Sequence, residues 1–441
     1  MSKIQRSGWG RNLFVDVRYK SLENFSPLDT WSGAQGLAVG LGRSYGDSSL
    51  NSQGTSWQSS GLKAMHFSDS FQEVTCGAGV TIGELERFAS QKGLFPPVVP
   101  GTEYVSIGGA IASDIHGKSH HSFGSFGNNV LEIQLQTASG EILSLKPDDA
   151  TREYFWATVG GMGLTGAILS AKLKLIPVSS SSISVFEQRV SSISEMLATL
   201  KEFDSSYLYT VAWIDLSGKF EGRGVVSGGN HHVDESLKMN ESMEHNKNQI
   251  VKPLPLPPIP PFNYLNRNLV RIFNEFWYRK PLKRELSNYR PFLHPLDKIA
   301  DWNKLYGRNG FLQYQYVIPY GGEHFLKYTL EVLRRHNISS ALAVLKQFGS
   351  TNSKYLSFQM PGWTLAVDMP MKVKGLQSIL RHLDDELTKI GGRVYLSKDS
   401  RLAQEHFLKM YPEATNWKKI KKELDPENYW RSMQGLRLGL C

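Results

Sequence analysis

The stretch from Pro97 to Val130 constrains this chain most, because glycine, serine and alanine make up much of it. A backbone without large side chains can approach a flat ligand closely and direct its N–H groups at that ligand. Glycine loses much conformational freedom on folding, so such a run predicts that a large group fits against the main chain. A flexible linker is the alternative, but linkers lack the recurring apolar residues of this run. Those residues are Val98, Val99, Ile107, Ile111 and Ile115.

Length and composition suit a globular protein of two domains with buried cores. The chain has 441 residues, 40% hydrophobic and 21% charged. Its formal net charge of +9 favours anionic partners such as phosphates, and no motif of a nucleic-acid-binding module occurs. Cys76 and Cys441 give no disulfide framework, and neither a signal peptide nor a bilayer-spanning apolar run is present. We expect a cytoplasmic protein, with peripheral contact at the inner face of the membrane left open.

Local patterns predict a helix and a hairpin beside the glycine-rich stretch. Thr81–Glu84 has the spacing of a capping box, which predicts a helix that runs to about Lys92. Apolar and polar residues alternate over 131–136 and again over 141–145, with Ser139–Gly140 between them. This arrangement predicts a β-hairpin.

The segment Gly161–Gly166 reads GMGLTG and matches the dinucleotide fingerprint G-x-G-x-x-G. That fingerprint needs a helix to open at its third glycine. Alternation from Leu169 to Leu175 predicts a strand there instead. We therefore expect no Rossmann site.

Composition changes after Pro177, where the run Ser179–Ser182 predicts a boundary between domains. Farther on, polar residues at 230–251 and a proline-rich segment at 252–262 predict either a loop over a site or a long surface excursion. The next helix is expected to carry an apolar stripe with basic residues nearby. Such a stripe suits anionic lipid or, as an alternative, the protein core. The stripe is Leu265, Leu269, Ile272, Phe273 and Phe276, and the basic residues are Arg267, Arg271, Arg279, Lys280, Lys283 and Arg284.

Five motifs carry a resemblance to a known family: GLGRSYGDSSLN at 40–51, PGT with SIGGAIASDIHGK at 100–118, GSFGNNV at 124–130, FWATVGGMGLTGAI at 155–168 and VYLSKDSR at 394–401. They resemble FAD oxidoreductases of the vanillyl-alcohol-oxidase (PCMH) type, and within these the decaprenylphosphoryl-ribose 2′-oxidase family. The resemblance implies a two-domain α+β fold with a substrate domain of one sheet plus helices. The FAD-binding domain would comprise residues 1–177 and 393–441, and the substrate domain 178–392.

The resemblance also implies the FAD-binding residues. FAD is expected to be held non-covalently, because Arg43 stands where several relatives tether the flavin through a histidine. The implied residues are Gly40, Gly42, Arg43, Ser44, Tyr45, Gly46, Asp47, Pro100, Gly101, Thr102, Ser106, Gly108, Gly109, Ala112, Ser113, Ile115, His116, Gly117, Gly163, Ile168, Tyr395 and Lys398.

The expected chemistry is oxidation of an alcohol, with hydride passing to the flavin and the hydroxyl proton leaving separately. Lys398 is the candidate for the positive charge beside the flavin, and Tyr45 would line the site. His116 could accept the hydroxyl proton or could be a structural residue, and both alternatives stay open. We expect no metal, because no carboxylate or cysteine completes a zinc site with His116, His120 and His121.

A second set of residues is expected to bind the substrate. Alternation places Gln313 and Gln315 on one strand face, where their amides suit the hydroxyls of a sugar, or simply face solvent. By resemblance, Lys346 meets a phosphate. Thr364 and Ala366, which contribute to the same pocket with Lys398, stand where mycobacterial relatives have asparagine and cysteine, which leaves the sugar and the lipid in doubt.

The implied function is oxidation of the 2′-hydroxyl of a polyprenyl-phosphoryl ribose to the ketone. This is the first half of an epimerisation to the arabinose form, in the synthesis of cell-envelope polysaccharide. The implied partner is a separate NAD(P)H-dependent short-chain dehydrogenase. The rivals are an FAD-dependent oxidase of a free sugar or alditol, and a flavin-free sugar-binding protein.

Overall fold

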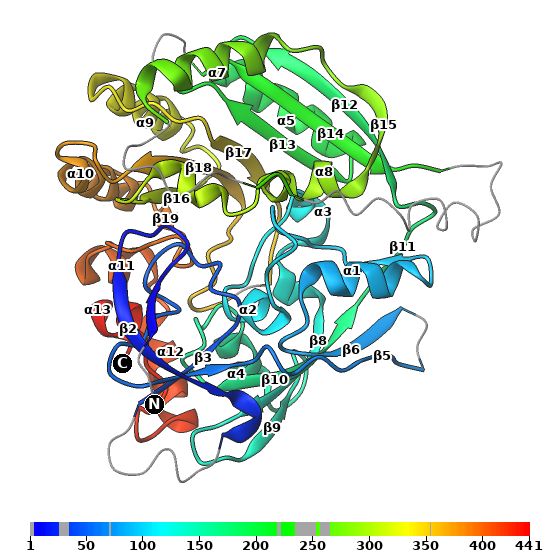
Figure 1. The fold of residues 1–441 in the computed structure, drawn as a ribbon, viewed down its shortest axis with the longest axis vertical. Helices are drawn as coiled ribbons and strands as arrows, with labels where there is room; N and C mark the ends of the chain where they lie inside the picture. Colours follow the sequence, from blue (N-terminus) through cyan, green and yellow to red (C-terminus); the bar gives the residue numbers. More distant parts are fainter. Residues whose placement is uncertain are drawn as a thin grey trace.

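The computed structural model describes residues 4–25, 35–69, 72–217, 222–233, 253–255, 265–352 and 354–441. A large sheet from the middle of the chain forms the upper half of the molecule in Figure 1, and smaller sheets from the first part form the lower half. The last helices of the chain lie beside the smaller sheets. Most of 230–262, expected as a loop or surface excursion, lies outside the described residues.

The first 177 residues form three of the four sheets. Their strand orders are β1-β2-β4-β3, β5-β6-β10-β8-β9 and β7-β11. The strands are β1 (Ile4–Ser7), β2 (Phe14–Ser21), β3 (Gly36–Val39), β4 (Thr55–Gln58), β5 (Met65–Phe67), β6 (Glu73–Gly77), β7 (Leu94–Phe95), β8 (Val130–Gln136), β9 (Ile142–Leu145), β10 (Ala167–Lys174) and β11 (Ile176–Pro177). The helices are α1 (Ile82–Ser90), α2 (Ile107–Ala112), α3 (His120–Phe123) and α4 (Arg152–Thr158).

The local patterns in this part give the expected elements. The hydroxyl of Thr81 accepts a hydrogen bond from the backbone N–H of Glu84, whose carboxylate accepts one from Thr81 in return, so the capping box starts α1. Strands β8 and β9 form the expected hairpin. Strand β10 begins directly after Gly166, which confirms that the glycine fingerprint opens no helix.

The middle of the chain forms an eight-stranded sheet of order β15-β12-β14-β13-β17-β18-β16-β19. Its strands are β12 (Ser182–Val190), β13 (Tyr209–Ile214), β14 (Gly224–His231), β15 (Arg284–Asn288), β16 (Phe311–Pro319), β17 (Ala343–Phe348), β18 (Gly362–Pro370) and β19 (Arg393–Val394). The helices of this part are α5 (Ile193–Ser206), α7 (Arg267–Arg279), α8 (Tyr289–Leu293), α9 (His324–Arg335) and α10 (Leu376–Lys389).

Helix α5 covers one face of this sheet. A Cβ at Gly228 of β14 would lie 3.0 Å from the ring of Phe203 on α5, so this side of the strand faces the helix. Successive residues of a strand point to opposite faces. Val225 and Ser227 therefore point to the other face, where they line a cavity.

The chain passes between the two parts twice. It enters the large sheet between β11 and β12 and leaves it after β19, which pairs with β16. The chain then forms α11 (Gln404–Met410), α12 (Ala414–Leu424) and α13 (Met433–Arg437), and Trp430 bridges to Gly36 beside the first sheet.

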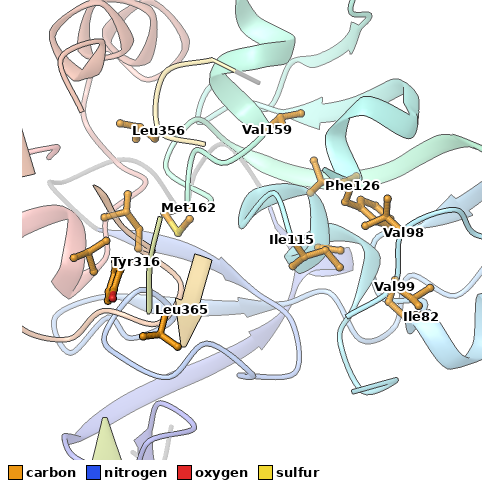
Figure 2. Close-up of a cluster of buried hydrophobic side chains, with 14 of the residues drawn as sticks. Ile82, Val98, Val99, Ile115, Phe126, Val159, Met162, Tyr316, Leu356 and Leu365 are labelled. Atoms are coloured by element: carbon orange, nitrogen blue, oxygen red, sulfur yellow. The ribbon is translucent and has the colours of Figure 1, made fainter. Parts of the chain in front are cut away.

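One continuous hydrophobic cluster joins the two parts. In Figure 2, Val98, Val99 and Phe126 lie on one side of this cluster, and Tyr316 and Leu365 of the large sheet lie on the other. The apolar residues of the glycine-rich stretch are thus buried, as their recurrence predicted. They anchor the glycine-rich backbone against the rest of the fold, which a linker would not do.

Candidate active site

A cavity of about 590 Å³ separates the glycine-rich segments of the first part from the open face of the large sheet. The structure brings nearly all of the predicted site residues to its wall. They are Gly40, Gly42, Arg43, Ser44, Tyr45, Pro100, Gly101, Thr102, Ser106, Gly108, Gly109, Ala112, Ser113, Ile115, His116, Gly117, Gly163, Ile168, Gln313, Gln315, Lys346, Thr364, Ala366, Tyr395 and Lys398.

Two predicted residues, Gly46 and Asp47, do not line the cavity. A Cβ at Gly46 would overlap the carbonyl oxygen of Asp399, so the glycine allows close packing of two backbones. The Asp47 carboxylate pairs with Arg437 at 2.8 Å. Both residues therefore hold later segments of the chain against the 40–45 loop.

Glycines give the first wall of the cavity its shape. Gly42 and Gly163 have φ angles of +63° and +74°, which L side chains rarely adopt. A Cβ at Gly42 would meet no atom within 4 Å, so its bare side faces open space. Helix α2 follows Ser106, whose hydroxyl accepts a hydrogen bond from the N–H of Gly109. This wall thus presents backbone to the cavity.

Three strands of the large sheet supply the opposite wall. In the register of β16, β18 and β17, Gln315 lies opposite Ala366 and Thr364 lies opposite Lys346. The Gln315 amide nitrogen donates to the Thr364 hydroxyl over 3.1 Å. Gln313 and Gln315 are both buried, so they do not face solvent. Polar groups of this sheet therefore converge on one end of the cavity.

His116 joins the two walls. Its Nε2 lies 2.8 Å from the Gln315 amide nitrogen, and its Nδ1 lies 3.2 Å from Nζ of Lys346. Burial, and then the charge of Lys346, hold the pKa of His116 well below its ordinary value, so the imidazole is neutral. A neutral imidazole donates through one nitrogen and accepts through the other. Both nitrogens of His116 are engaged in these contacts.

The charge of Lys346 is coupled to the hydrogen position on His116. When the Gln315 amide nitrogen donates to Nε2, Nδ1 carries the hydrogen and Lys346 has to be neutral to accept it. If the Gln315 amide is turned by 180°, its oxygen accepts a hydrogen bond from Nε2 of His116. Nδ1 then accepts a hydrogen bond from Lys346, which can be charged. Burial lowers the pKa of Lys346 to about 8, so both states are accessible near neutral pH.

Lys398 lies at the same end of the cavity, with Nζ 3.5 Å from the centre of the Tyr45 ring. The pKa of Lys398 is lowered to about 7, mainly by burial; the charge of Asp368 opposes this shift, and the charge of Lys346 adds a smaller lowering. An ammonium placed over an aromatic face is held by the ring quadrupole. The cavity thus contains a lysine whose charge responds to pH near neutrality.

Sequence reasoning missed one buried carboxylate beneath these residues. Asp368 is fully buried, and its oxygens accept hydrogen bonds from the Gln313 amide at 2.6 Å and the Tyr306 hydroxyl at 3.1 Å. Burial raises the pKa of Asp368 to about 7. Alternation along β18 puts Asp368 on the same face as Thr364 and Ala366, and that signal was present in the sequence.

Sequence reasoning also missed Lys118, a cation that lines the cavity. Its Nζ donates to the carbonyl of Leu293 over 3.0 Å, and burial lowers its pKa to about 7. Among the described residues, no group of three or more His, Cys, Asp or Glu is arranged to hold a metal ion.

The first wall fits FAD by its chemistry. Its glycines leave room for a flat ring system, and the cavity-lining residues within 38–49, 99–118 and 162–168 include Arg43 but no carboxylate. A phosphate against these segments would therefore meet N–H groups and the Arg43 guanidinium. Arg43 donates to the Leu41 carbonyl and lies over the Trp9 ring, which holds the guanidinium at the cavity edge.

Comparisons with known proteins agree with this geometry. The FAD binding domain family matches residues 30–146. Decaprenylphosphoryl-beta-D-ribose oxidase of Mycolicibacterium smegmatis is 38% identical over 92% of this chain and 89% of its own length. An uncharacterized protein of Streptomyces coelicolor is 30% identical over 82% of this chain and all of its own. D-arabinono-1,4-lactone oxidase of Yarrowia lipolytica is 30% identical over 25% of this chain and 21% of its own.

These matches confirm the expected two-domain α+β fold of the vanillyl-alcohol-oxidase (PCMH) type and the expected cofactor, FAD. They exclude the flavin-free alternative. The chain is an FAD-dependent oxidoreductase and belongs to the decaprenylphosphoryl-β-D-ribose oxidase family.

Proposed function

We propose that this enzyme oxidises the 2′-hydroxyl of a polyprenyl-phosphoryl ribose to the 2′-ketone. The observation that carries the proposal is the pairing of two walls: one is fit for FAD, and the other gathers two amides and Lys346. Lys118 and Lys398 line the same cavity. Gln313 and Gln315 suit the hydroxyls of a pentose, and Lys346 with Lys118 suits its phosphate. The similarity to an oxidase named for the same kind of substrate supports this assignment.

Bound FAD would supply the hydride acceptor. The residues of the chain orient the sugar and set the charges around it. Lys398 holds a positive charge that stabilises negative charge developing in the cavity. His116 can accept the hydroxyl proton once the substrate hydroxyl takes the place of Gln315 at Nε2. Lys346, at Nδ1, sets which nitrogen of His116 carries a hydrogen.

The test compares bleaching of the flavin, without oxygen, by decaprenylphosphoryl ribose and by free ribose. The proposal expects fast bleaching with the lipid-linked sugar alone. Equal bleaching by free ribose or an alditol would favour the rival oxidase. The buried lysines argue against that rival, because a neutral sugar gives their positive charges no anionic partner.

The proposal also includes the division of the chain into two domains. The FAD-binding domain is taken as residues 1–177 with 393–441 and the substrate domain as 178–392, although β19 (393–394) pairs with the large sheet.

The return of hydride from NAD(P)H is assigned to a separate short-chain dehydrogenase, because Gly161–Gly166 leads into β10. The ketone should accumulate with this enzyme alone, and formation of the epimer without a second protein would refute the assignment.

We also place the enzyme on the inner face of a membrane, through helix α7. None of the described helices is long and apolar enough to cross a bilayer. The apolar stripe of α7 faces outward, however, except for Leu265 before the helix, which packs against a buried aromatic cluster. Ile272 and Phe276 are 67% and 68% exposed. Arg267, Arg271 and Arg279 lie on the same helix, so charge and apolar area together suit an anionic lipid surface.

A further inference from the structure

The cavity continues along the sheet well beyond its polar end. Gln315 pairs with Ala366, Ala366 with Val344, Val344 with Trp213 and Trp213 with Val225, and all five line the cavity. They form one cross-strand row over β16, β18, β17, β13 and β14. The row is polar at Gln315 and apolar from Ala366 onward.

The row is longer than a phosphoryl pentose needs. Neighbouring strands lie about 4.8 Å apart, so the apolar part from Ala366 to Val225 spans about 14 Å. The phosphate is attached to the carbon next to the reacting 2′ carbon of the sugar. Sugar and phosphate therefore both stay at the polar end, near Gln315 and Lys346, and leave the rest of the row for another group.

The facing wall of this stretch is mostly apolar. It is contributed by α8 and the residues that follow it, and its apolar members are Pro291, Phe292, Pro295, Leu296 and Ile299. Asp297 and Lys298 of the same segment also line the cavity. Two walls of mainly apolar side chains suit a hydrocarbon chain, because burying hydrocarbon is favourable.

The far end of the stretch lies at α7. Trp277, near the end of that helix, lines the cavity together with Lys280 and Lys283, and the Lys283 side chain is 36% exposed. The outer side of the same helix carries the exposed Ile272 and Phe276. The cavity therefore opens beside the surface assigned to the bilayer.

Cations surround this opening. Lys280, Lys283 and Lys298 all line it, and Glu187 pairs with Lys280 at 3.8 Å. Burial first, and the charges of Lys283 and Lys280 next, lower the pKa of Lys298. Such mutual repulsion is relieved by an anionic surface, as in the headgroup region of an acidic bilayer.

From the continuous row, its apolar facing wall and its opening, we propose that the stretch from Ala366 to Val225 is a binding channel for the polyprenyl chain of the substrate. The chain enters from the bilayer beside α7 and runs to the polar end, where the sugar meets the flavin wall. This channel rests on the proposed function, and it explains how a lipid reaches a buried site without leaving the membrane.

Ser227→Trp tests the channel by obstructing it. Ser227 lines the cavity and pairs with Val211 and Glu187 near the far end. The matched control is Ser184→Trp, on an exposed position of β12 that does not line the cavity. Circular dichroism and FAD content check that both variants fold, and Val225→Phe serves as a milder obstruction.

The measured quantity is the ratio of kcat/KM for decaprenyl-phosphoryl ribose to that for geranyl-phosphoryl ribose, both in detergent micelles. Obstruction should lower this ratio about tenfold or more, because the long chain loses several buried methylene groups that the short chain never places there. Ser184→Trp should leave the ratio unchanged. An unchanged ratio in both Ser227→Trp and Val225→Phe would overturn the channel.

Binding of decaprenyl phosphate, which has no sugar to oxidise, separates the channel from the reaction. Calorimetry should show tighter binding of decaprenyl than of geranyl phosphate to the wild-type holoenzyme, and Ser227→Trp should remove the difference. Equal affinity for both phosphates in the wild type would refute the channel. The expected binding pattern, without bleaching by any lipid-linked ribose, would support the channel and refute the proposed function.

Discussion

At the scale of single residues, the proposed oxidation depends on the positive charge of Lys398. The pKa of this lysine is lowered by burial, yet its Nζ lies against Tyr45 at the end of the cavity where the two walls meet. Lys398→Ala should keep the fold and slow flavin reduction by about 10²- to 10³-fold, the usual effect of removing one pre-organised charge contact. Anaerobic stopped-flow bleaching measures this rate.

Lys389→Ala is the matched control for Lys398→Ala, since Lys389 pairs with Glu386 on the surface of α10. It should reduce the flavin at the wild-type rate. Near-normal bleaching in Lys398→Ala, with full FAD content, would remove Lys398 from the chemistry.

Asp368 makes the pH dependence predictable. The rate should fall as pH rises through about 7, because Lys398 loses its proton there. The negative charge of Asp368 raises the pKa of Lys398, so Asp368→Asn should lower that pKa and move the fall in rate to lower pH. The pH profile of kcat/KM reports the groups of the substrate-free enzyme. A midpoint that stays in place, or moves to higher pH, would contradict this coupling.

At the scale of elements, the orientation of β18 can be tested chemically. Ala366 lines the cavity, whereas Leu365 is fully buried on the other face. Ala366→Cys should react with a thiol reagent in the folded protein, and bound substrate should slow the reaction. The test uses a Cys441→Ser background, because Cys441 is partly exposed, while Cys76 is buried and its pKa is raised to about 12. An introduced thiol that reacts only after unfolding would show that the strand is wrongly placed.

Helix α7 gives a prediction about lipid binding. Sedimentation with vesicles that contain phosphatidylglycerol should carry down the wild type, and Ile272→Glu with Phe276→Glu should lower the bound fraction several-fold. The control, Ile142→Glu, changes an apolar residue of β9 that is 54% exposed, and this variant should bind like the wild type. Binding should weaken with salt, because part of it is electrostatic. Unchanged binding of the double variant would contradict the assignment of this stripe to the membrane.

At the scale of the whole molecule, local patterns were predictable and long-range partners were not. The capping box of α1 and the hairpin of β8 and β9 depend on residues a few positions apart, so the sequence contains them. The pairing of Asp47 with Arg437 joins opposite ends of the chain, and no spacing rule links them. The sequence therefore could not show that Asp47 pairs with Arg437 or that Gly46 packs against Asp399.

The same limit applies to the site. The motifs predicted most residues that line the cavity, including His116 and Lys398, because these motifs resemble those of a family of FAD oxidoreductases. Asp368 was missed because its importance comes from burial beneath Gln313, which only the register of β16 and β18 reveals. The apolar period of α7 was visible, but periodicity cannot tell whether such a stripe faces the core or solvent.

Hydride transfer from the 2′ carbon can be tested with a deuterated substrate. The holoenzyme is mixed without oxygen with decaprenylphosphoryl ribose that carries deuterium at the 2′ carbon, and flavin bleaching is compared with that caused by the unlabelled substrate. The account predicts that the label slows bleaching several-fold, because the bond to that hydrogen breaks in the step observed. Equal rates for the two substrates, or no bleaching by either, would contradict it.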